Sequence, residues 1–373
     1  MESNICTIEQ LKDFIVLSPI EEKKLKQITK KHPMSVTPYY LSLINWDDPD
    51  DPIRKMAIPS IEELNRQGSY DTSGEAENTK MTGLQHKYQE TVLILATNKC
   101  AMYCRHCFRK RMVGLHTNEI IERFKVAVDY IKCHKQINNV LISGGDPLVL
   151  KNTTIEQILS MLSNIPQLNF IRFGSRAPVT FPSRFNDDEL LRILSKYSLT
   201  DRRIYVNTQF NHPNEITKQS IKAVKNLLKS GISVNNQTVL LKGVNDNPMT
   251  IVNLQNKLVS IGVNPYYFFQ CRPVKGVKNH FQVPICKGVR IIDEAKKHLN
   301  GLSKRFGFIM SHRTGKIEIL GLFENEIYFK YHQAKNRKSI GKIFKRPMNE
   351  NAGWLDDFKS TSESLLNPAP YLL

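Results

Sequence analysis

The run Thr91-Val-Leu-Ile-Leu-Ala-Thr97 leads, after two residues, into Cys100-Ala-Met-Tyr-Cys104-Arg-His-Cys107. A short continuous run of strand-forming apolar residues is typical of a strand buried in a parallel sheet. Three thiols then fall within eight positions, with the spacing C-x3-C-x2-C. Cysteine thiolates from one short loop are the usual ligands of iron–sulfur clusters. The stretch therefore predicts a buried strand followed by a cluster-binding loop, and three cysteines leave one iron of a [4Fe-4S] cube open to another ligand.

A structural zinc site is the alternative interpretation of the closely spaced cysteines. Such a site normally has four ligands, often as paired C-x2-C units, and the nearby candidates for a fourth ligand are His86 and His106. The single set of three cysteines favours iron and sulfur instead. The seven cysteines of the chain are odd in number, which does not match a disulfide framework and indicates a reducing compartment.

Helical and strand patterns alternate along the chain after the cysteine loop. Strands are expected at residues 139–143, 170–174, 203–207, 232–240, 265–270 and 306–310. Helices are expected at residues 119–132, 154–162, 187–196, 215–228, 248–261 and 284–299. Such repeats form a parallel sheet with right-handed crossovers. The predicted fold class is α/β, a partial (βα)6 TIM-like barrel whose active site lies on the loops after the strands.

Three parts of the chain are expected. These are a helical N-terminal extension at residues 1–85, the barrel at 86–300 and a short C-terminal extension at 301–373. In the first part, Ser18 and Pro19 mark a helix start, residues 47–52 are expected to break any helix, and residues 71–82 are expected to be extended. Residues from about 317 onward alternate as in a β-hairpin.

The formal net charge of +18 is spread widely, with denser basic runs at residues 21–26 and 330–346. Such a balance can mark nucleic-acid binding, but the basic runs lack interleaved aromatic residues, so nucleic acid is not the expected partner. No stretch approaches the ~20 apolar residues of a membrane span, and residues 1–6 do not resemble a signal peptide. A cytoplasmic protein without membrane contact is therefore expected.

Ordered segments of the chain resemble the lysine 2,3-aminomutase family of the radical SAM superfamily. They are residues 51–55, 82–88, 100–107, 172–178, 207–216, 236–246 and 265–267. The resemblance runs in order from about residue 50 to about residue 316. It implies a radical SAM isomerase that moves an amino group from C2 to C3 of an amino acid by way of a 5'-deoxyadenosyl radical.

The resemblance also implies how the radical is generated. Cys100, Cys104 and Cys107 would ligate three irons of a [4Fe-4S] cluster, and the fourth iron would bind the amino and carboxylate groups of S-adenosylmethionine. Other residues are expected to contact this cosubstrate, with ordinary strand-end hydrogen bonds as the alternative role. They are Ser143, Gly144, Gly145, Asp146, Asn207, His212 and Gln237.

Pyridoxal 5'-phosphate carries the substrate amine in this family. Lys316 matches the family lysine that binds it, in order and in its place behind a glycine, with a surface lysine as the alternative. Tyr88 is retained from the family's phosphate-binding neighbourhood, but Thr91 stands where a further arginine is expected and Phe269 replaces a tyrosine. Arg109 matches the arginine that holds the substrate carboxylate, which a guanidinium can bind with two hydrogen bonds, with pairing to a carboxylate of the barrel rim as the alternative.

The substrate is where the chain departs from the lysine enzymes. Arg272 stands where they have an aspartate for the side-chain ammonium of lysine, and their second aspartate falls near the uncharged Ile309. A cation at residue 272 would attract an anionic side chain, so an acidic or neutral amino acid is expected, with glutamate the simplest candidate. A phosphate bound by Arg272 and Lys275 is the alternative.

Two other functions and several partners complete the expectations. A pyridoxal-independent radical SAM enzyme that modifies RNA or protein is the second candidate, and a non-catalytic iron–sulfur redox or regulatory protein is the third. The expected partners are a small amino-acid substrate and an electron donor such as flavodoxin or ferredoxin. No cysteine follows Cys286, so any homo-oligomer would form without the C-terminal zinc site of the lysine enzyme.

Overall fold

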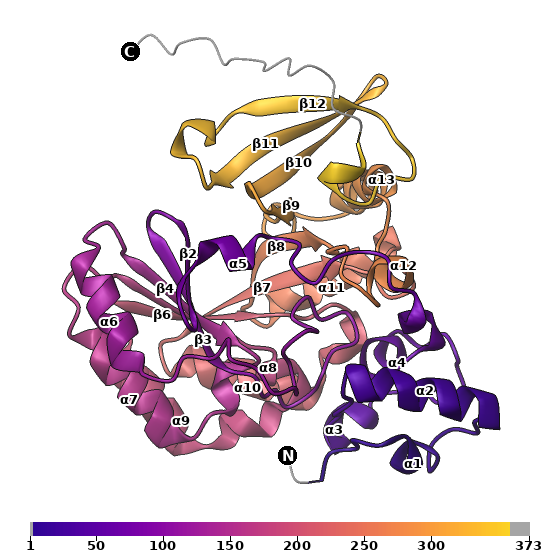
Figure 1. The fold of residues 1–373 in the computed structure, drawn as a ribbon, viewed down its shortest axis with the longest axis horizontal. Coiled ribbons are helices and arrows are strands. Elements are labelled where there is room, and N and C mark those ends of the chain that lie inside the picture. The colour runs from indigo at the N-terminus through magenta and orange to yellow at the C-terminus, as the bar shows by residue number, and fades with distance from the viewer. Residues whose placement is uncertain (1–2, 359–373) are drawn as a thin grey trace.

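The computed structural model describes residues 3–358 of the 373-residue chain. The N-terminal helices lie beside the barrel in Figure 1. They are α1 (Ile8–Leu11), α2 (Pro19–Lys31), α3 (Pro38–Leu41), α4 (Pro52–Ala57) and the 3-10 helix η1 (Ile61–Leu64). The predicted start of α2 is confirmed, because the Ser18 side chain accepts a hydrogen bond from the Glu21 N–H. In the described part of the chain, no helix has both the length and the apolar character needed to cross a membrane.

Residues 47–52 were predicted to break any helix, and this prediction is wrong for Pro52, the last of them. Asp51 caps α4, accepting a hydrogen bond from the Arg54 N–H, and Pro52 is its first residue. Proline at this position removes an N–H that has no partner inside a helix, so it begins a helix as readily as it ends one.

One mixed sheet of twelve strands forms the centre of the molecule, and its strands are neighbours in chain order. Strands β3 to β9 pair in parallel. They are β3 (Thr91–Thr97), β4 (Asn139–Gly144), β5 (Phe170–Gly174), β6 (Arg203–Thr208), β7 (Ser233–Leu240), β8 (Asn264–Gln270) and β9 (Gly307–His312). The strands predicted from the sequence agree with these bounds to within one or two residues. The open sheet and its crossover helices confirm the predicted α/β partial barrel.

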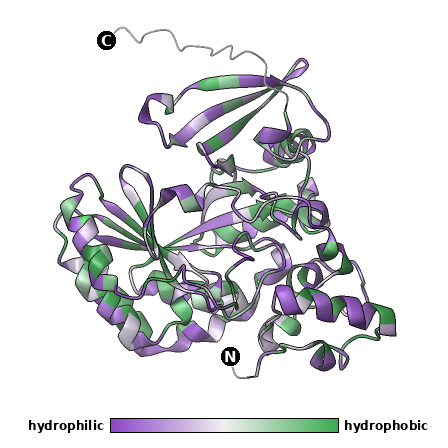
Figure 2. Ribbon diagram, in the orientation of Figure 1, coloured by the Kyte–Doolittle hydropathy of each residue, from purple (hydrophilic) through white to green (hydrophobic). Residues whose placement is uncertain are grey.

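The crossover helices pack along the outside of the strands (Figure 1). They are α6 (Phe124–Cys133), α7 (Asn152–Ser163), α8 (Ala177–Thr180), α9 (Asp188–Tyr197), α10 (Lys218–Lys229), α11 (Pro248–Ser260), α12 (Lys278–Phe281) and α13 (Ile285–Lys297). Each longer helix buries an apolar stripe; in α7 the stripe includes Ile155, Leu159 and Leu162. Figure 2 shows hydrophobic residues along the strands and on the helices that cover them.

Two segments differ from the sequence-based expectation. Helix α6 begins at Phe124, not at residue 119, because Glu119 pairs with Arg111 of the cysteine loop at 2.5 Å. The segment at 71–82 is not wholly extended, since it holds α5 (Glu75–Asn78) and β1 (Thr79–Met81). Asp71 starts this helix by accepting hydrogen bonds from the N–H groups of Glu75 and Ala76.

Antiparallel strands extend the sheet at both ends. Strand β2 (Leu84–Tyr88) joins β1 to β3. At the other end β10 (Gly315–Phe323) and β11 (Glu326–Ala334) form the predicted hairpin, and β12 (Ile343–Pro347) pairs with β11. A single sheet continues across residues 85 and 300. The division of the chain at these two positions stays a prediction.

Candidate active site

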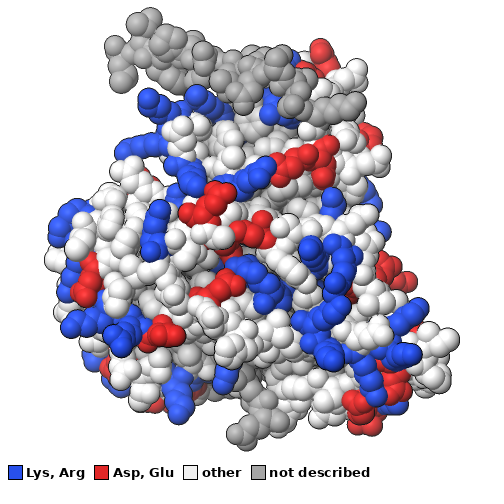
Figure 3. Space-filling model, in the orientation of Figure 1, with Lys and Arg blue, Asp and Glu red and all other residues white. Residues whose placement is uncertain are grey.

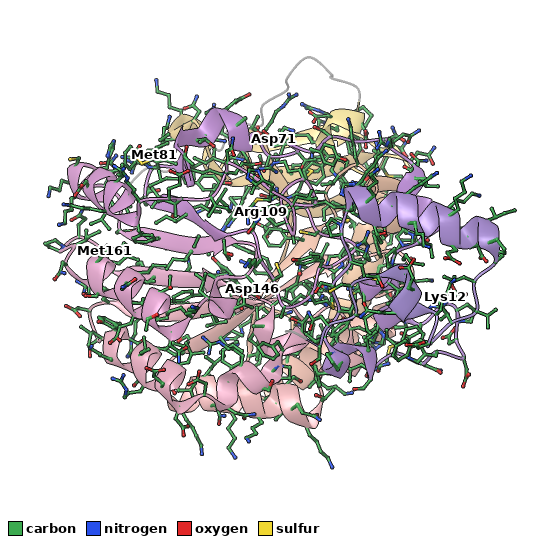
Figure 4. The ribbon with its side chains drawn as sticks, turned by 60° about the horizontal axis from the view of Figure 1, so that its bottom comes forward. Lys12, Asp71, Met81, Arg109, Asp146 and Met161 are labelled. Carbon is green, nitrogen blue, oxygen red and sulfur yellow. The ribbon has the colours of Figure 1, made fainter. Side chains whose placement is uncertain are left out.

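A cavity of about 340 Å³ opens at the carboxyl ends of the parallel strands. Figure 4 shows two of its residues, Arg109 and Asp146, near the centre of the molecule. It brings together almost every site residue predicted from the sequence: Tyr88, Cys100, Cys104, Cys107, Arg109, Ser143, Gly144, Gly145, Asp146, Asn207, Gln237, Arg272 and Lys316. His212 is the exception. It does not line the cavity, and its ring accepts a hydrogen bond from the Asn214 N–H at the start of η4 (Pro213–Glu215).

The cysteine loop presents all three thiols to this cavity. Arg176 donates a hydrogen bond to the Cys104 sulfur at 2.8 Å, and the Arg109 N–H donates to the Cys107 sulfur at 3.3 Å. Burial raises the pKa of the Cys107 thiol to about 11, so binding iron must displace its proton. Among the described residues no three His, Cys, Asp or Glu side chains are placed to hold a single metal ion. Cysteines of an iron–sulfur cube bind different irons, so they need to face one space and not one point.

A buried ion triad stabilises the cysteine loop, taken here as residues 100–111. Glu63 of η1 accepts hydrogen bonds from Arg105 at 2.8 and 2.6 Å and from Lys110 at 2.6 Å. Burial acts to raise the pKa of Glu63, but Arg105 and Lys110 outweigh it and lower this pKa to about 2. Because both cations belong to the loop, the triad fixes the loop to the N-terminal extension.

We expect Glu63→Gln to destabilise the protein by roughly 3–5 kcal/mol, because the two buried cations lose their counter-charge. Chemical denaturation followed by circular dichroism measures the loss. Glu350→Gln is the matched control, since the pair of Glu350 with Arg290 lies in solvent, and its free energy of unfolding should stay close to that of the wild type. Equal stabilities for both variants would contradict a structural role for the triad.

Two glycines at the end of β4 allow the ends of neighbouring strands to approach closely. Gly144 has φ +114°, and a Cβ on it would lie 2.2 Å from the Thr97 carbonyl oxygen. A Cβ on Gly145 would lie 2.3 Å from the carbonyl oxygen of Lys99. Their contact with the cosubstrate stays a prediction; in the structure they admit the backbone that leads to Cys100. Side chains are excluded at both positions.

Asp146 organises the rim next to these glycines. Its carboxylate accepts hydrogen bonds from the N–H groups of Leu148 at 3.1 Å and Arg176 at 2.8 Å, and burial raises its pKa. Arg176 in turn forms a buried ion pair with Glu215 and bonds Cys104. Asp146 therefore positions the arginine that contacts a thiol.

Five residues that line the same cavity each have a buried polar atom with no hydrogen-bond partner among the described residues. These atoms are His106 Nδ1, Arg109 Nε, Asn207 Nδ2, Thr208 Oγ1 and Gln270 Oε1. Buried polar groups in native proteins are nearly always bonded, so this concentration matches a site that binds a polar ligand. The chemistry of the donors fits the predicted cosubstrate, which carries amino, carboxylate and hydroxyl groups.

Lys316 lies on β10, where its backbone pairs with Ser311 of β9. Burial, and then the positive charges of Arg172, Arg272 and Lys87, lower its pKa to about 7. Its ammonium lies 4.7 Å from the centre of the Tyr267 ring. A lysine with so low a pKa is a ready nucleophile at neutral pH.

Lys87 is a second amine with a lowered pKa in the cavity. Burial and the charge of Arg272 bring this pKa to about 7, and its Nζ donates hydrogen bonds to the carbonyl oxygens of Ser73 and His312. Thr91 and Phe269, the two departures noted from the sequence, line the same cavity. Thr91 and Phe269 do not replace the hydrogen-bond donors that the family has at these positions. The cations around Lys316 nevertheless fit the phosphate of pyridoxal phosphate.

Arg109 and Arg272 both lie against Phe108, at 4.6 and 4.0 Å from its ring centre. Arg109 donates to the Ser143 hydroxyl at 3.0 Å, and its Nε lies 3.5 Å from Glu75. Burial of Glu75 acts to raise its pKa, but Arg109 and other guanidinium groups outweigh it and lower this pKa to about 2. Arg109 thus has one carboxylate neighbour.

Arg272 donates hydrogen bonds only to hydroxyl groups, those of Ser73 at 2.8 Å and Ser311 at 3.1 Å. Burial lowers its pKa to about 10, so it stays charged at neutral pH. The correspondence of Ile309 to the second family aspartate stays a prediction. Ile309 is buried and does not line the cavity, whereas Ser311 lines it and bonds Arg272.

Glu75, Phe108 and Arg176 are cavity residues that were not assigned a role from the sequence. A sequence signal existed for Arg176, which follows β5 in the position where barrel enzymes place active-site residues. The other two carry no such signal, and Glu75 lies in a helix outside the βα repeat.

Residues 94–254 match the radical SAM superfamily, whose domains bind a [4Fe-4S] cluster and S-adenosylmethionine. A relative from Aquifex aeolicus, named for lysine 2,3-aminomutase activity, is 42% identical over 92% of this chain and 93% of its own. The L-lysine 2,3-aminomutase of Clostridium subterminale is 43% identical over 81% of this chain and 72% of its own.

A third relative is named for a different substrate. It is the glutamate 2,3-aminomutase of Clostridioides difficile, which is 37% identical over 81% of this chain and 71% of its own. The cavity places three thiols, a buried lysine with a lowered pKa and two arginines together, and the sequences agree over most of each chain. The protein therefore belongs to the lysine 2,3-aminomutase family of radical SAM isomerases.

Proposed function

We propose that this protein is a pyridoxal-dependent 2,3-aminomutase that acts on an acidic amino acid, with glutamate as the substrate. The observation that carries the proposal is the state of Arg272. It is a buried cation in the cavity of Lys316 and the thiols, and its described hydrogen bonds go only to hydroxyls. Glu75 acts on Arg272 electrostatically, but no described carboxylate forms a hydrogen bond or salt bridge with it, and a buried charge without such a partner is costly unless a ligand supplies one.

The thiol side of the cavity is assigned to radical generation. Cys100, Cys104 and Cys107 would hold the cluster, and Arg176 donates a hydrogen bond to the Cys104 sulfur. Hydrogen bonds to cluster sulfurs tune the reduction potential. When bound, the cluster and S-adenosylmethionine supply a radical that removes a hydrogen atom from the substrate. The Nδ2 group of Asn207, which has no hydrogen-bond partner among the described residues, supports the role of this residue, with Gln237, in orienting the cosubstrate.

The opposite side of the cavity is assigned to the amino group that moves. Lys316 supplies the amine that holds pyridoxal phosphate, a cofactor that lets the substrate nitrogen migrate between carbons. Its pKa of about 7 keeps a large fraction of the amine unprotonated at neutral pH. Lys87, Arg172 and the hydroxyl of Tyr88 line the cavity and provide donors for the phosphate.

Two arginines select the substrate by its two carboxylates. Arg109 orients the α-carboxylate, and its position is set by the Ser143 hydroxyl and Glu75. Arg272 binds the side-chain carboxylate, with Ser73 and Ser311 fixing the guanidinium. The placement of both against Phe108 supports recognition of a dicarboxylic amino acid. A side-chain ammonium would be repelled by Arg272.

The same proposal names the cellular setting. The protein works in the cytoplasm, receives electrons from a flavodoxin or ferredoxin, and forms any homo-oligomer without a C-terminal zinc site. On the face that Figure 3 shows, acidic side chains lie among the basic ones, which supports a small-molecule substrate over a nucleic acid.

The test is a substrate panel. The reconstituted protein, with dithionite and S-adenosylmethionine, is incubated with glutamate, aspartate, glutamine, alanine and lysine, and β-amino products are identified by mass spectrometry. We expect β-glutamate as the main product. Conversion of lysine alone would contradict the assignment of Arg272, and no β-amino product from any member would favour the pyridoxal-independent alternative.

A further inference from the structure

A second, smaller pocket of about 160 Å³ lies at the C-terminal end of α2. Its lining includes four cations from three separate segments: Lys30, Lys31, Arg66 and Lys275. We call these four residues the basic pocket. Figure 3 shows Lys and Arg side chains gathered on the face that carries the N-terminal helices.

The charge of the basic pocket is not neutralised by neighbouring carboxylates. Within residues 3–358, none of the four cations has a salt-bridge partner, whereas Lys12 and Lys26 nearby both pair with Glu22. Glu63, the carboxylate in the lining, is already bound by Arg105 and Lys110. The helix dipole favours cations at the end of α2, but it does not account for Arg66 and Lys275.

The basic pocket lies directly behind the cysteine loop. His32 Nδ1, in its lining, is 3.3 Å from the carbonyl oxygen of Lys110. Lys110 Nζ is 3.4 Å from the carbonyl oxygen of Gly276, which also lines the pocket. Arg105, between two of the cysteines, bonds the carbonyl oxygen of Pro33 at 2.9 Å. One layer of residues therefore separates the pocket from the loop, whose other side lines the active-site cavity.

We propose that the basic pocket docks the acidic face of a small one-electron donor protein, which reduces the cluster through the cysteine loop. This proposal rests on the cluster of the proposed function. With a flavodoxin as donor, the flavin hydroquinone loses one electron to become the semiquinone, and the [4Fe-4S] cluster passes from the 2+ to the 1+ state. Uncompensated charge attracts an oppositely charged partner and speeds its encounter.

Position and composition favour a redox protein over a nucleic acid. Electron delivery requires proximity to the cluster, which this pocket has and which nucleic-acid binding would not need. Single-stranded nucleic acid is usually held by exposed aromatic rings between the cations. The lining of the basic pocket contains the ring of Tyr70, and the Lys275 ammonium covers this ring at 5.3 Å from its centre.

The test uses charge reversal in the complete protein, with a purified acidic flavodoxin as the probe. The variant Lys30→Glu/Lys31→Glu/Arg66→Glu is compared with Lys222→Glu/Lys225→Glu/Lys229→Glu, which reverses three exposed lysines of α10. Two quantities are measured: the Kd for flavodoxin by calorimetry at low and high salt, and the rate at which the reduced-cluster EPR signal appears. Each rate is measured with reduced flavodoxin and, separately, with dithionite.

We expect the pocket variant to weaken the Kd at low salt by roughly tenfold or more. Reduction by flavodoxin should slow to a similar degree, while reduction by dithionite is unchanged. High salt should weaken binding of the wild type and remove the difference between the proteins. The α10 variant should behave like the wild type.

Three outcomes would overturn the proposal. The first is an unchanged flavodoxin Kd in the pocket variant, and the second is an equal loss in the α10 variant. The third is tight binding of bulk tRNA that only the pocket variant loses, with flavodoxin binding unaffected.

If charge reversal also prevents reduction by dithionite, the neutral variant Lys30→Gln/Lys31→Gln is tested instead. An unchanged Kd for flavodoxin in that variant rejects docking at the basic pocket. A wild type that dithionite cannot reduce would contradict the proposed cluster, while the Kd still decides the docking surface.

Discussion

Lys316→Ala is expected to lower aminomutase activity by on the order of 10³-fold or more, because it removes the amine to which the cofactor is joined. The same change should abolish covalent capture of pyridoxal phosphate. After borohydride treatment of the wild type, mass spectrometry should find the phosphopyridoxyl mass on the peptide that contains Lys316. The variant should carry no such mass on any peptide.

The pH dependence of this capture follows from the environment of Lys316. Burial and three neighbouring cations lower its pKa to about 7, from about 10.4 for a free lysine. Only the unprotonated amine attacks the aldehyde, and its fraction rises as pH increases through the pKa. The initial rate of capture should therefore rise between pH 6 and pH 8 and then level off. An ordinary lysine would show a continuing rise to pH 10.

Two variants serve as controls for Lys316→Ala. Lys316→Arg keeps the positive charge but not the nucleophile, so it should also fail to capture the cofactor. Lys335→Ala removes an exposed lysine that pairs with Glu77, and it should retain capture at residue 316. The cofactor is held elsewhere if the wild type carries the phosphopyridoxyl mass on another lysine, or if that mass is still found after Lys316→Ala.

The barrel was predictable because its signals are local. Buried parallel strands are short continuous apolar runs, and the helices between them carry an amphipathic period. The run at 91–97 and the strand at 170–174 were predicted with the bounds that the structure has. Helix starts were less predictable because tertiary contacts decide them. Glu119 has a helical sequence context, but its ion pair with Arg111 keeps it outside α6.

The candidate site was predictable where the chemistry lies in one motif or at a strand end. The three cysteines were found in this way, whereas Arg109 and Lys316 came from the family resemblance, and all five residues line one cavity. Contacts between distant segments gave no signal. Glu63 and Glu75 reach the cysteine loop from outside the barrel, and nothing in their neighbourhoods marks them. His212 shows the opposite error, since a strand-end position did not place its ring in the cavity.

Charge reversal at Arg272 is expected to change which amino acid the protein accepts. Arg272→Asp should lower kcat/KM for glutamate by roughly 30- to 4,000-fold, since a truncated buried charge contact costs about 2–5 kcal/mol. Adding Ser311→Asp places a second carboxylate where the Ser311 hydroxyl now bonds Arg272. The double variant should convert lysine measurably, because two carboxylates would then face a side-chain ammonium in the same part of the cavity.

Arg272→Lys separates the charge of this residue from its shape. A lysine keeps the cation but loses the planar fork that binds a carboxylate with two hydrogen bonds, so glutamate should remain the preferred substrate with a higher KM. Capture of pyridoxal phosphate by Lys316 is measured in every variant to show that the cofactor site is intact. If Arg272→Asp loses capture but keeps its preference for glutamate, Arg272 serves the cofactor phosphate. If it retains capture and loses glutamate, the cation at the end of β8 selects the substrate.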